Sequence, residues 1–281
     1  MATKKAKKPA AKSAKSKARK AAPKARRRSV LKASPTIKAA AERSAKRAAK
    51  GAPIKRKAGI AKPSAAKKAA NRYVLHGIFA SLPSCKVGLM LSMCGVPFDY
   101  HHVDLRAGAH KTPEFLAKNR FGQVPVLEHA GHEIAQSNVI LDYLARTTGR
   151  LAGHSEAERL RVAEWLMWEQ DRLASGLGIT RFLTRFAPDT PDEVMRFVRA
   201  RGEAALDTLE RHLGTAKFLA GAAPTIADVA VFPWIATAEE GGFDIARWPN
   251  VQAWAQRLLT LPGVAHPYAL MPKEDRVAAG S

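Results

Sequence analysis

The fold of this chain is decided by residues 121–143, which read FGQVPVLEHAGHEIAQSNVILDY. Two short apolar runs flank a turn at residues 129–132, a pattern typical of a β-hairpin. Ser137 then stands at the position of a helix N-cap, and apolar residues recur behind it at helical spacing. The stretch therefore predicts a hairpin followed by a helix.

Pro125 restricts how this hairpin can pair. Proline has no backbone N–H, so Pro125 is expected to begin a strand or to lie at a sheet edge. The backbone of Val124 is then free to pair with a group from outside the chain. We expect an extended peptide to dock there.

The segment before the hairpin predicts alternating strands and helices. Residues 73–78 and 98–104 read as strands, and residues 84–94 between them read as a helix that ends at Gly95. Thr112 followed by Pro113 is an N-cap and first-position proline that opens a short helix. The order predicts a small βαβ plus ββα layer between about Arg72 and Thr148.

Strand signals disappear after residue 151. Residues 156–180 are apolar at helical period, and Thr190 is expected to cap a helix that runs through Leu213. Thr225 and Asp228 form a capping box that opens an apolar segment, and residues 249–261 predict a last helix. We therefore expect three parts: a basic tail at 1–71, an α/β domain at 72–150 and an all-helical domain at 151–281.

Charge separates the tail from the rest of the chain. Residues 1–70 contain 25 Lys and Arg and one acid, Glu42, which leaves 22 basic and 23 acidic residues for the remainder. The tail is rich in Lys, Ala and Pro and contains no aromatic residue. It cannot bury enough apolar surface to offset the entropy of ordering, so we expect it to be disordered.

The composition of this tail favours one function, which is to neutralise the phosphates of a nucleic acid. It would give salt-dependent binding of DNA or RNA with little sequence preference, and no stacking on bases. The composition resembles the tails of linker histones and of bacterial histone-like proteins. Two other readings stay open: a tail that solubilises the protein or binds an acidic partner, and an organelle transit peptide.

The remaining composition indicates a cytoplasmic protein, with nucleoid association through the tail. Cys85 and Cys94 lie nine positions apart on one predicted helix, about 13.5 Å along its axis, so they are too distant for a disulfide. No apolar run approaches the ~18 residues of a membrane span. The scattered histidines and the two cysteines give no metal-ligand spacing, so no metal site is expected.

The order of these parts resembles the cytosolic glutathione transferase superfamily over residues 72 to about 268. Four segments carry the resemblance: the turn at 81–84, Val124-Pro125 with its cis-proline, Gln136-Ser137, and the capping box at 225–228. Among the subfamilies, the serine-type, theta-like bacterial enzymes are the most similar. The resemblance implies a thioredoxin-like N-terminal domain, an all-α C-terminal bundle, glutathione as co-substrate and a homodimer.

The resemblance also implies roles for individual residues. Ser81 would donate a hydrogen bond to the glutathione thiolate, with help from the N-terminus of the following helix. Gln136 and Ser137 would bind the γ-glutamyl α-carboxylate, Val124 and Pro125 the cysteinyl unit, and His110, with Lys111 beside it, the glycyl carboxylate. The predicted function is attack of the thiolate on an apolar electrophile, in detoxification.

Several alternatives remain at this point. Ser81 and Ser137 read equally as plain turn and cap residues, and His110 and Lys111 as a solvated loop. Cys85, in the first helical turn, would favour reduction of disulfides or peroxides if it were reactive. Trp165, Trp168 and Phe182 read either as second-substrate residues or as core. The alternative from another class of function is a non-catalytic binding module of this fold that the tail tethers to nucleic acid.

Overall fold

The computed structural model describes residues 71–277. The predictions for the basic tail fall on residues 1–70, outside the described part. Within residues 71–277, no helix is long and apolar enough to cross a membrane.

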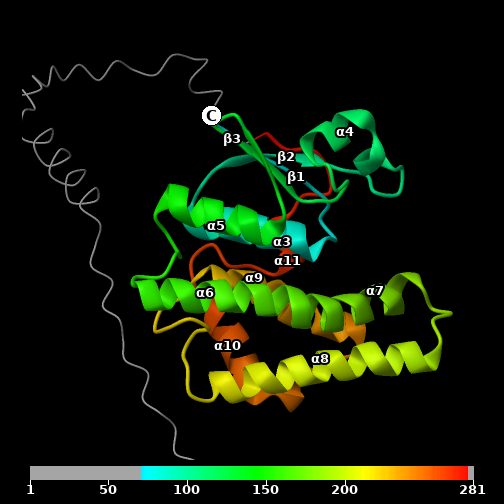
Figure 1. Ribbon diagram of the computed structural model, residues 1–281, viewed down its shortest axis with the longest axis vertical. Coiled ribbons are helices and arrows are strands. Elements are labelled where there is room, and N and C mark those ends of the chain that lie inside the picture. Colours follow the sequence, from blue (N-terminus) through cyan, green and yellow to red (C-terminus); the bar gives the residue numbers. More distant parts are fainter. Residues whose placement is uncertain (1–70, 278–281) are drawn as a thin grey trace, which may run out of the picture. The chain divides into compact units, whose positions relative to one another are not determined.

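Four strands form one mixed sheet, in the order β2–β1–β3–β4 (Figure 1). The strands are β1 (Tyr73–Gly77), β2 (Phe98–His102), β3 (Val126–His129) and β4 (His132–Ala135). β1 runs parallel to β2 and antiparallel to β3, which pairs antiparallel with β4. The predicted hairpin is confirmed: Ala130 and Gly131 turn the chain with φ of 52° and 79°, as a two-residue hairpin of the primed kind requires.

Helices cover both faces of this sheet. Side chains alternate between faces along β3, so Leu127 packs with α3 (Leu82–Cys94) and α5 (Ser137–Thr148), while Val126 packs with Phe115 of α4 (Pro113–Lys118). A 3₁₀ turn, η1 (Ala109–Lys111), precedes α4. The predicted cap of α4 is confirmed, because the Thr112 side chain accepts the backbone N–H of Phe115.

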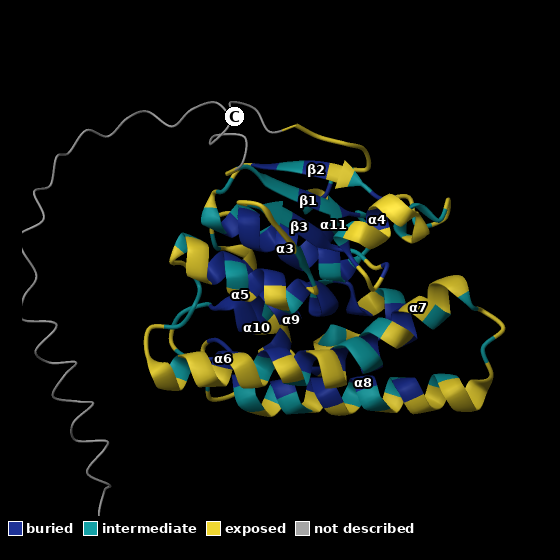
Figure 2. Cartoon of the chain, turned by 45° about the horizontal axis from the view of Figure 1, so that its top comes forward, coloured by how far each residue is buried: buried dark blue, intermediate teal, exposed yellow. Residues whose placement is uncertain are grey.

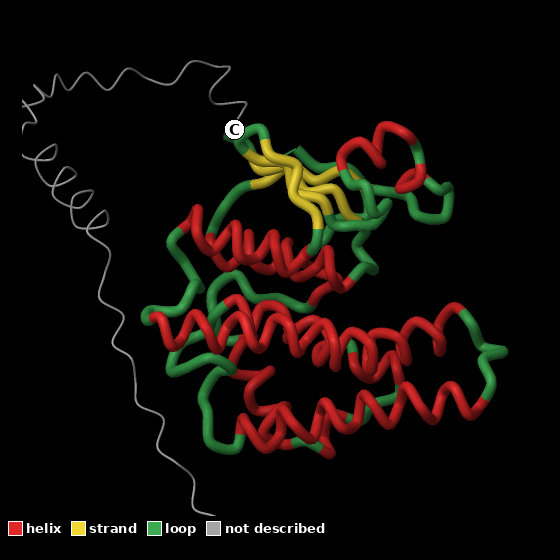
Figure 3. Tube along the Cα trace, viewed as in Figure 1, coloured by secondary structure: helices red, strands yellow, loops and turns green. Residues whose placement is uncertain are grey.

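The rest of the described chain is helical (Figure 3). Its elements are α6 (Glu156–Trp168), η2 (Glu169–Gly178), α7 (Ile179–Phe186), α8 (Asp192–Leu213), α9 (Ile226–Ala236), η3 (Ala238–Gly241), η4 (Ile245–Arg247), α10 (Pro249–Leu259) and α11 (Pro267–Leu270). Figure 2 shows that α6 and α8 carry long exposed faces. In contrast, α9 is buried on nearly every side, so its apolar residues form the centre of the core.

Two predictions for the helices after residue 151 are wrong. The helix expected over 156–180 is interrupted by η2, a π-helix, and helical structure continues to Phe186. A Cβ on Gly176 of η2 would lie 2.7 Å from the backbone nitrogen of Gly202 in α8, so the two backbones are in close contact there. Thr190 is not the cap of α8, because Pro191 takes that position and the helix begins at Asp192.

The capping box at the start of α9 is confirmed and reaches further than predicted. The buried carboxylate of Asp228 accepts the backbone N–H and the hydroxyl of Thr225, and also the Leu219 N–H and the Trp254 indole N–H. One carboxylate thus joins α9 to the preceding loop and to α10.

Candidate functional site

A cleft of about 480 Å³ opens beside the turn between β1 and α3. It is lined by all six residues predicted from the sequence: Ser81, His110, Val124, Pro125, Gln136 and Ser137. These residues come from four separate segments of the chain: the turn before α3, η1, the loop before β3 and the start of α5. The sheet brings the loops together, because β1 and β3 are paired neighbours.

Ser81 is the N-cap of α3, and its side-chain oxygen accepts the backbone N–H of Ser84 at 3.4 Å. The helix begins at Leu82, two residues earlier than expected, with Pro83 in its first turn. Capping uses the oxygen of the hydroxyl as an acceptor, so the hydroxyl hydrogen remains available as a donor. Ser81 can therefore cap the helix and donate to a ligand at the same time.

The peptide bond between Val124 and Pro125 is cis, as expected from the sequence. Val124 lies outside the strand ladders, which begin at Val126. Asn119 holds the preceding loop, since its amide donates to the carbonyl of Gln123 at 2.6 Å and accepts the N–H of Phe121 at 3.0 Å. The loop therefore presents the Val124 backbone to the cleft in a fixed position.

Ser137 does not have the predicted N-cap position. It is the first residue of α5, and Gln136 is the cap, with φ of 70° and no side-chain cap bond. A left-handed φ is uncommon for glutamine, and such backbone conformations concentrate at functional sites. This start of α5 still suits the binding of an anion. No side chain caps its first turn, and the positive end of the helix dipole faces the cleft.

His110 and Lys111 belong to η1 at the cleft wall. The Lys111 ammonium donates to the carbonyl of Gly122 at 3.2 Å. The Nδ1 atom of His110 is buried and has no hydrogen-bond partner among the residues that the structure describes. The residue as a whole lines the cleft, so its imidazole is part of the cleft wall beside Lys111.

Gln170 also lines the cleft, and the sequence analysis missed it. Its amide donates to Glu169, a fully buried carboxylate that also accepts the Lys86 ammonium at 2.7 Å and the Trp234 indole N–H at 2.5 Å. Asn138, directly after Ser137, donates to the same carboxylate at 2.9 Å. Burial lowers the pKa of Lys86, and Glu169 acts in the opposite direction. Glu169 thus connects the N-terminal halves of α3 and α5 to the helical part of the chain.

Cys85 is closed to substrates. Its side chain is fully buried, and its thiol donates to the carbonyl of Phe79 at 3.3 Å. Burial raises the pKa of the Cys85 thiol to about 12, so the thiol is protonated at neutral pH. The alternative of a reactive cysteine at this position is not supported by the geometry.

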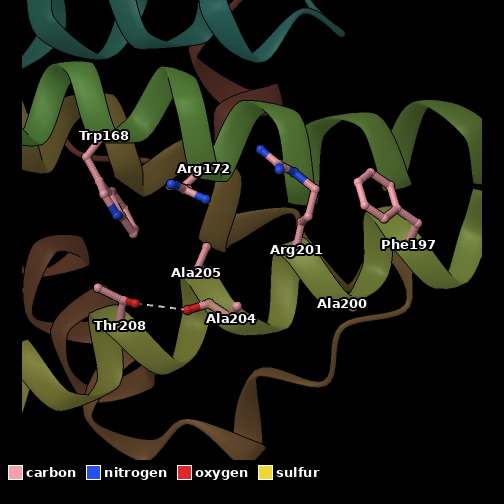
Figure 4. A pocket seen from close by; sticks show the side chains of 8 residues that line it. All are labelled: Trp168, Arg172, Phe197, Ala200, Arg201, Ala204, Ala205 and Thr208. Carbon is pink, nitrogen blue, oxygen red and sulfur yellow. Dashed lines mark hydrogen bonds between the residues drawn. The ribbon is translucent and has the colours of Figure 1, made fainter.

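The tryptophans considered for a second-substrate pocket do not line this cleft. Trp165 packs against Trp168, with ring centroids 5.0 Å apart. Trp168 faces a separate groove of about 360 Å³ between η2 and α8, where Phe197 and Arg201 also lie (Figure 4). Phe182, on α7, is 57% exposed.

No metal site accompanies the cleft in the described structure. Among residues 71–277, no group of three or more His, Cys, Asp and Glu side chains is placed to hold a metal ion.

A thioredoxin-like layer with a serine-capped helix and a cis-proline loop, followed by an all-helical domain, is the fold of the glutathione transferases. The profile described as "Glutathione S-transferase, N-terminal domain" matches residues 72–146, and "Glutathione S-transferase, C-terminal domain" matches residues 170–257. The chain belongs to this family, so the predicted fold class is confirmed.

Individual relatives agree with this assignment. Maleylacetoacetate isomerase of Rhizobium meliloti is 32% identical over 72% of this chain and all of its own length, and glutathione S-transferase 3 of Zea mays is 32% identical over 70% and 94%. The crystal structure of a glutathione S-transferase from Pseudomonas fluorescens Pf-5 is 34% identical and superposes with a TM-score of 0.65 over 69% of this chain and 98% of that one. Another from the same strain, with two glutathione molecules bound, is 26% identical, with a TM-score of 0.63 over 69% and 91%. These relatives support a function of the glutathione-transferase type.

Proposed function

We propose that this protein is a serine-type glutathione transferase that ionises the glutathione thiol and directs it at an apolar electrophile. The observation that carries the proposal is the convergence of six residues, predicted from separate motifs, on one cleft. The bound glutathione of a solved relative supports glutathione as co-substrate. The expected role is detoxification in the cytoplasm.

The cleft offers a partner to each part of glutathione. The γ-glutamyl carboxylate binds at Gln136 and Ser137, where the helix dipole and the free N–H groups of α5 attract an anion. The cysteinyl unit pairs with the backbone of Val124 as an added strand. The glycyl carboxylate reaches His110 and Lys111, which lie in η1 at the cleft wall.

Ser81 supplies the chemistry. A free thiol with pKa near ~8.5 is only slightly ionised at neutral pH. The Ser81 hydroxyl donates to the sulfur while its oxygen still caps α3. The N-terminus of the same helix adds a positive potential, so both effects stabilise the thiolate.

Replacement of Ser81 tests this role. We expect Ser81→Ala to lower kcat with an aryl halide at least about tenfold, since it removes a hydrogen bond to a charged group, and to change the Kd for glutathione much less. Ser84→Ala is the matched control, because the Ser84 hydroxyl lies in the same turn and has no partner among the described residues. Equal turnover in Ser81→Ala and wild type would refute the role.

The basic tail supports a second proposal, binding of nucleic acid. The observation that favours it is the contrast between 25 basic residues and one acid in residues 1–70 and a nearly neutral remainder. Deletion of residues 1–71 should abolish salt-sensitive retention on random-sequence DNA while glutathione turnover persists. Equal retention of the shortened protein would contradict the proposal.

We also propose that the protein is a homodimer, as the family resemblance implies. Large apolar side chains are exposed on three helices, namely Val139 on α5, Leu160 and Met167 on α6, and Phe197 on α8. Apolar side chains that gather in one exposed patch mark protein–protein interfaces, and a second copy of the chain would cover them. Sedimentation equilibrium should give twice the chain mass, and a monomer at micromolar concentration would contradict this.

A further inference from the structure

A cluster of charged and polar side chains joins α7, η3 and α11. The Glu240 carboxylate accepts the Arg181 Nε–H at 2.8 Å and the Tyr268 hydroxyl at 2.6 Å, and it also pairs with Arg185. Arg181 in turn donates to the Tyr268 oxygen at 2.5 Å. Burial favours the protonated form of Glu240, but hydrogen bonds from Tyr268 and the arginines outweigh it and lower the pKa of the carboxyl group. The cluster is therefore charged at neutral pH.

This cluster borders the turn that carries Ser81. The ring of Tyr268 meets the ring of Phe79 edge-on, with centroids 6.3 Å apart, and the Lys273 ammonium lies 5.6 Å from the Phe79 ring. Phe79 belongs to the tight turn closed by the hydrogen bond from the Ser81 N–H to the Ile78 carbonyl. None of the cluster residues lines the cleft assigned to glutathione, so they border Ser81 outside that cleft.

Arg185 has hydrogen-bond donors that no described residue uses. Its side chain is 40% exposed, and its described contacts to Glu240 and Tyr268 use Nη1. Among residues 71–277, its Nε and Nη2 groups have no hydrogen-bond partner. A guanidinium group with unused donors on its fork matches the two oxygens of a carboxylate.

Apolar rings flank this guanidinium group. Phe182 and Phe186 are 57% and 51% exposed, and their ring centroids are 5.4 Å apart. Positions 182, 185 and 186 share one face of α7, because residues three and four apart are neighbours on a helix. One exposed face of α7 thus combines two aromatic rings with a cation.

We propose that the second-substrate site selects electrophiles that combine an apolar ring with a carboxylate, bound by Phe182, Arg185 and Phe186. The inference rests on the proposed transferase function and adds the chemical class of the second substrate. Arg185 binds the carboxylate through its unused donors, and the rings of α7 cover the apolar part. Arg185 is a specificity residue and takes no part in ionising the thiol.

A pair of glutathione conjugates tests the inference by binding alone. S-(4-carboxybenzyl)glutathione and S-(4-carbamoylbenzyl)glutathione have nearly the same shape and differ in the charge at the ring. Isothermal titration calorimetry on the full chain should give a lower Kd for the carboxylate, by about tenfold. The ratio of the two Kd values should fall to near one in Arg185→Gln and be partly restored in Arg185→Lys.

Arg196→Gln is the control for net charge, because Arg196 is an exposed arginine on α8 outside the cluster. It should leave the ratio of Kd values at the wild-type value. Equal Kd values for the two conjugates in the wild type, or an unchanged ratio in Arg185→Gln, would overturn the inference and leave the transferase function standing. Failure of both conjugates to bind would overturn the proposed function and the inference with it.

Discussion

Ser81 illustrates how one side chain can serve structure and chemistry together. Its oxygen accepts a backbone N–H at the start of α3, while its hydrogen stays free to donate into the cleft. A plain turn serine and a thiolate-binding serine are therefore compatible roles. Ser137 differs, because its side chain caps no helix: it is buried in the first turn of α5 and lines the cleft.

His110→Ala should weaken glutathione binding with little effect on chemistry. The substitution removes an imidazole from the cleft wall, and with it the proposed contact to the glycyl carboxylate. We expect the KM for glutathione to rise about fivefold to tenfold, equivalent to ~1–1.4 kcal/mol, with kcat nearly unchanged. The control is His154→Ala, an exposed histidine outside the cleft. An equal KM in His110→Ala and wild type would exclude His110 from the site.

The residues of the cleft that could be predicted belong to local motifs. Ser81, Val124, Pro125, Gln136 and Ser137 each lie in a turn whose geometry a few neighbouring residues determine. Gln170 and its partner Glu169 could not be predicted, because their contacts reach Asn138, 31 positions away from Glu169, and Lys86, 83 positions away. Nothing in the local sequence indicates such partners.

At the scale of elements, strand and helix order could be predicted because period-two and period-3.6 patterns alternate clearly through residues 73–148. The long helix after residue 156 was predicted wrongly in its interior. Apolar periodicity does not separate an α-helix from a π-helix, and η2 forms where Gly176 meets Gly202 of α8. That contact depends on tertiary packing, which the pattern does not contain.

Replacement of Asp228 should damage folding and spare chemistry. The two carboxylate oxygens of Asp228 now accept four hydrogen bonds. Asp228→Asn keeps only one of these oxygens, and its new NH₂ group faces buried donors. We expect the free energy of unfolding to fall by about 3 kcal/mol, measured by urea denaturation. Asp244→Asn is the control, since Asp244 caps η4 at an exposed position and should cost at most ~1 kcal/mol. A stable Asp228→Asn with impaired turnover would contradict a structural role.

At the scale of the whole molecule, the described part couples a sheet layer to a helical part through the buried carboxylate of Glu169. Its partners come from α3, α5 and α9, and Gln170 beside it lines the cleft. A charge buried this deeply is tolerated because each oxygen has donors. The position of Gln136 and Ser137, the proposed γ-glutamyl end of the cleft, is thus tied to the packing of the helical part.

The central claim is that glutathione lies along Val124 and is ionised beside Ser81. The most direct measurement is a pH titration of the thiolate ultraviolet absorbance of glutathione bound to the full chain, in wild type and in Ser81→Ala. We predict that binding lowers the thiol pKa by about two units from ~8.5, equivalent to ~2.7 kcal/mol, and that Ser81→Ala loses a large part of this shift. A bound thiol that titrates as in free solution, or an equal shift in both proteins, would contradict the claim.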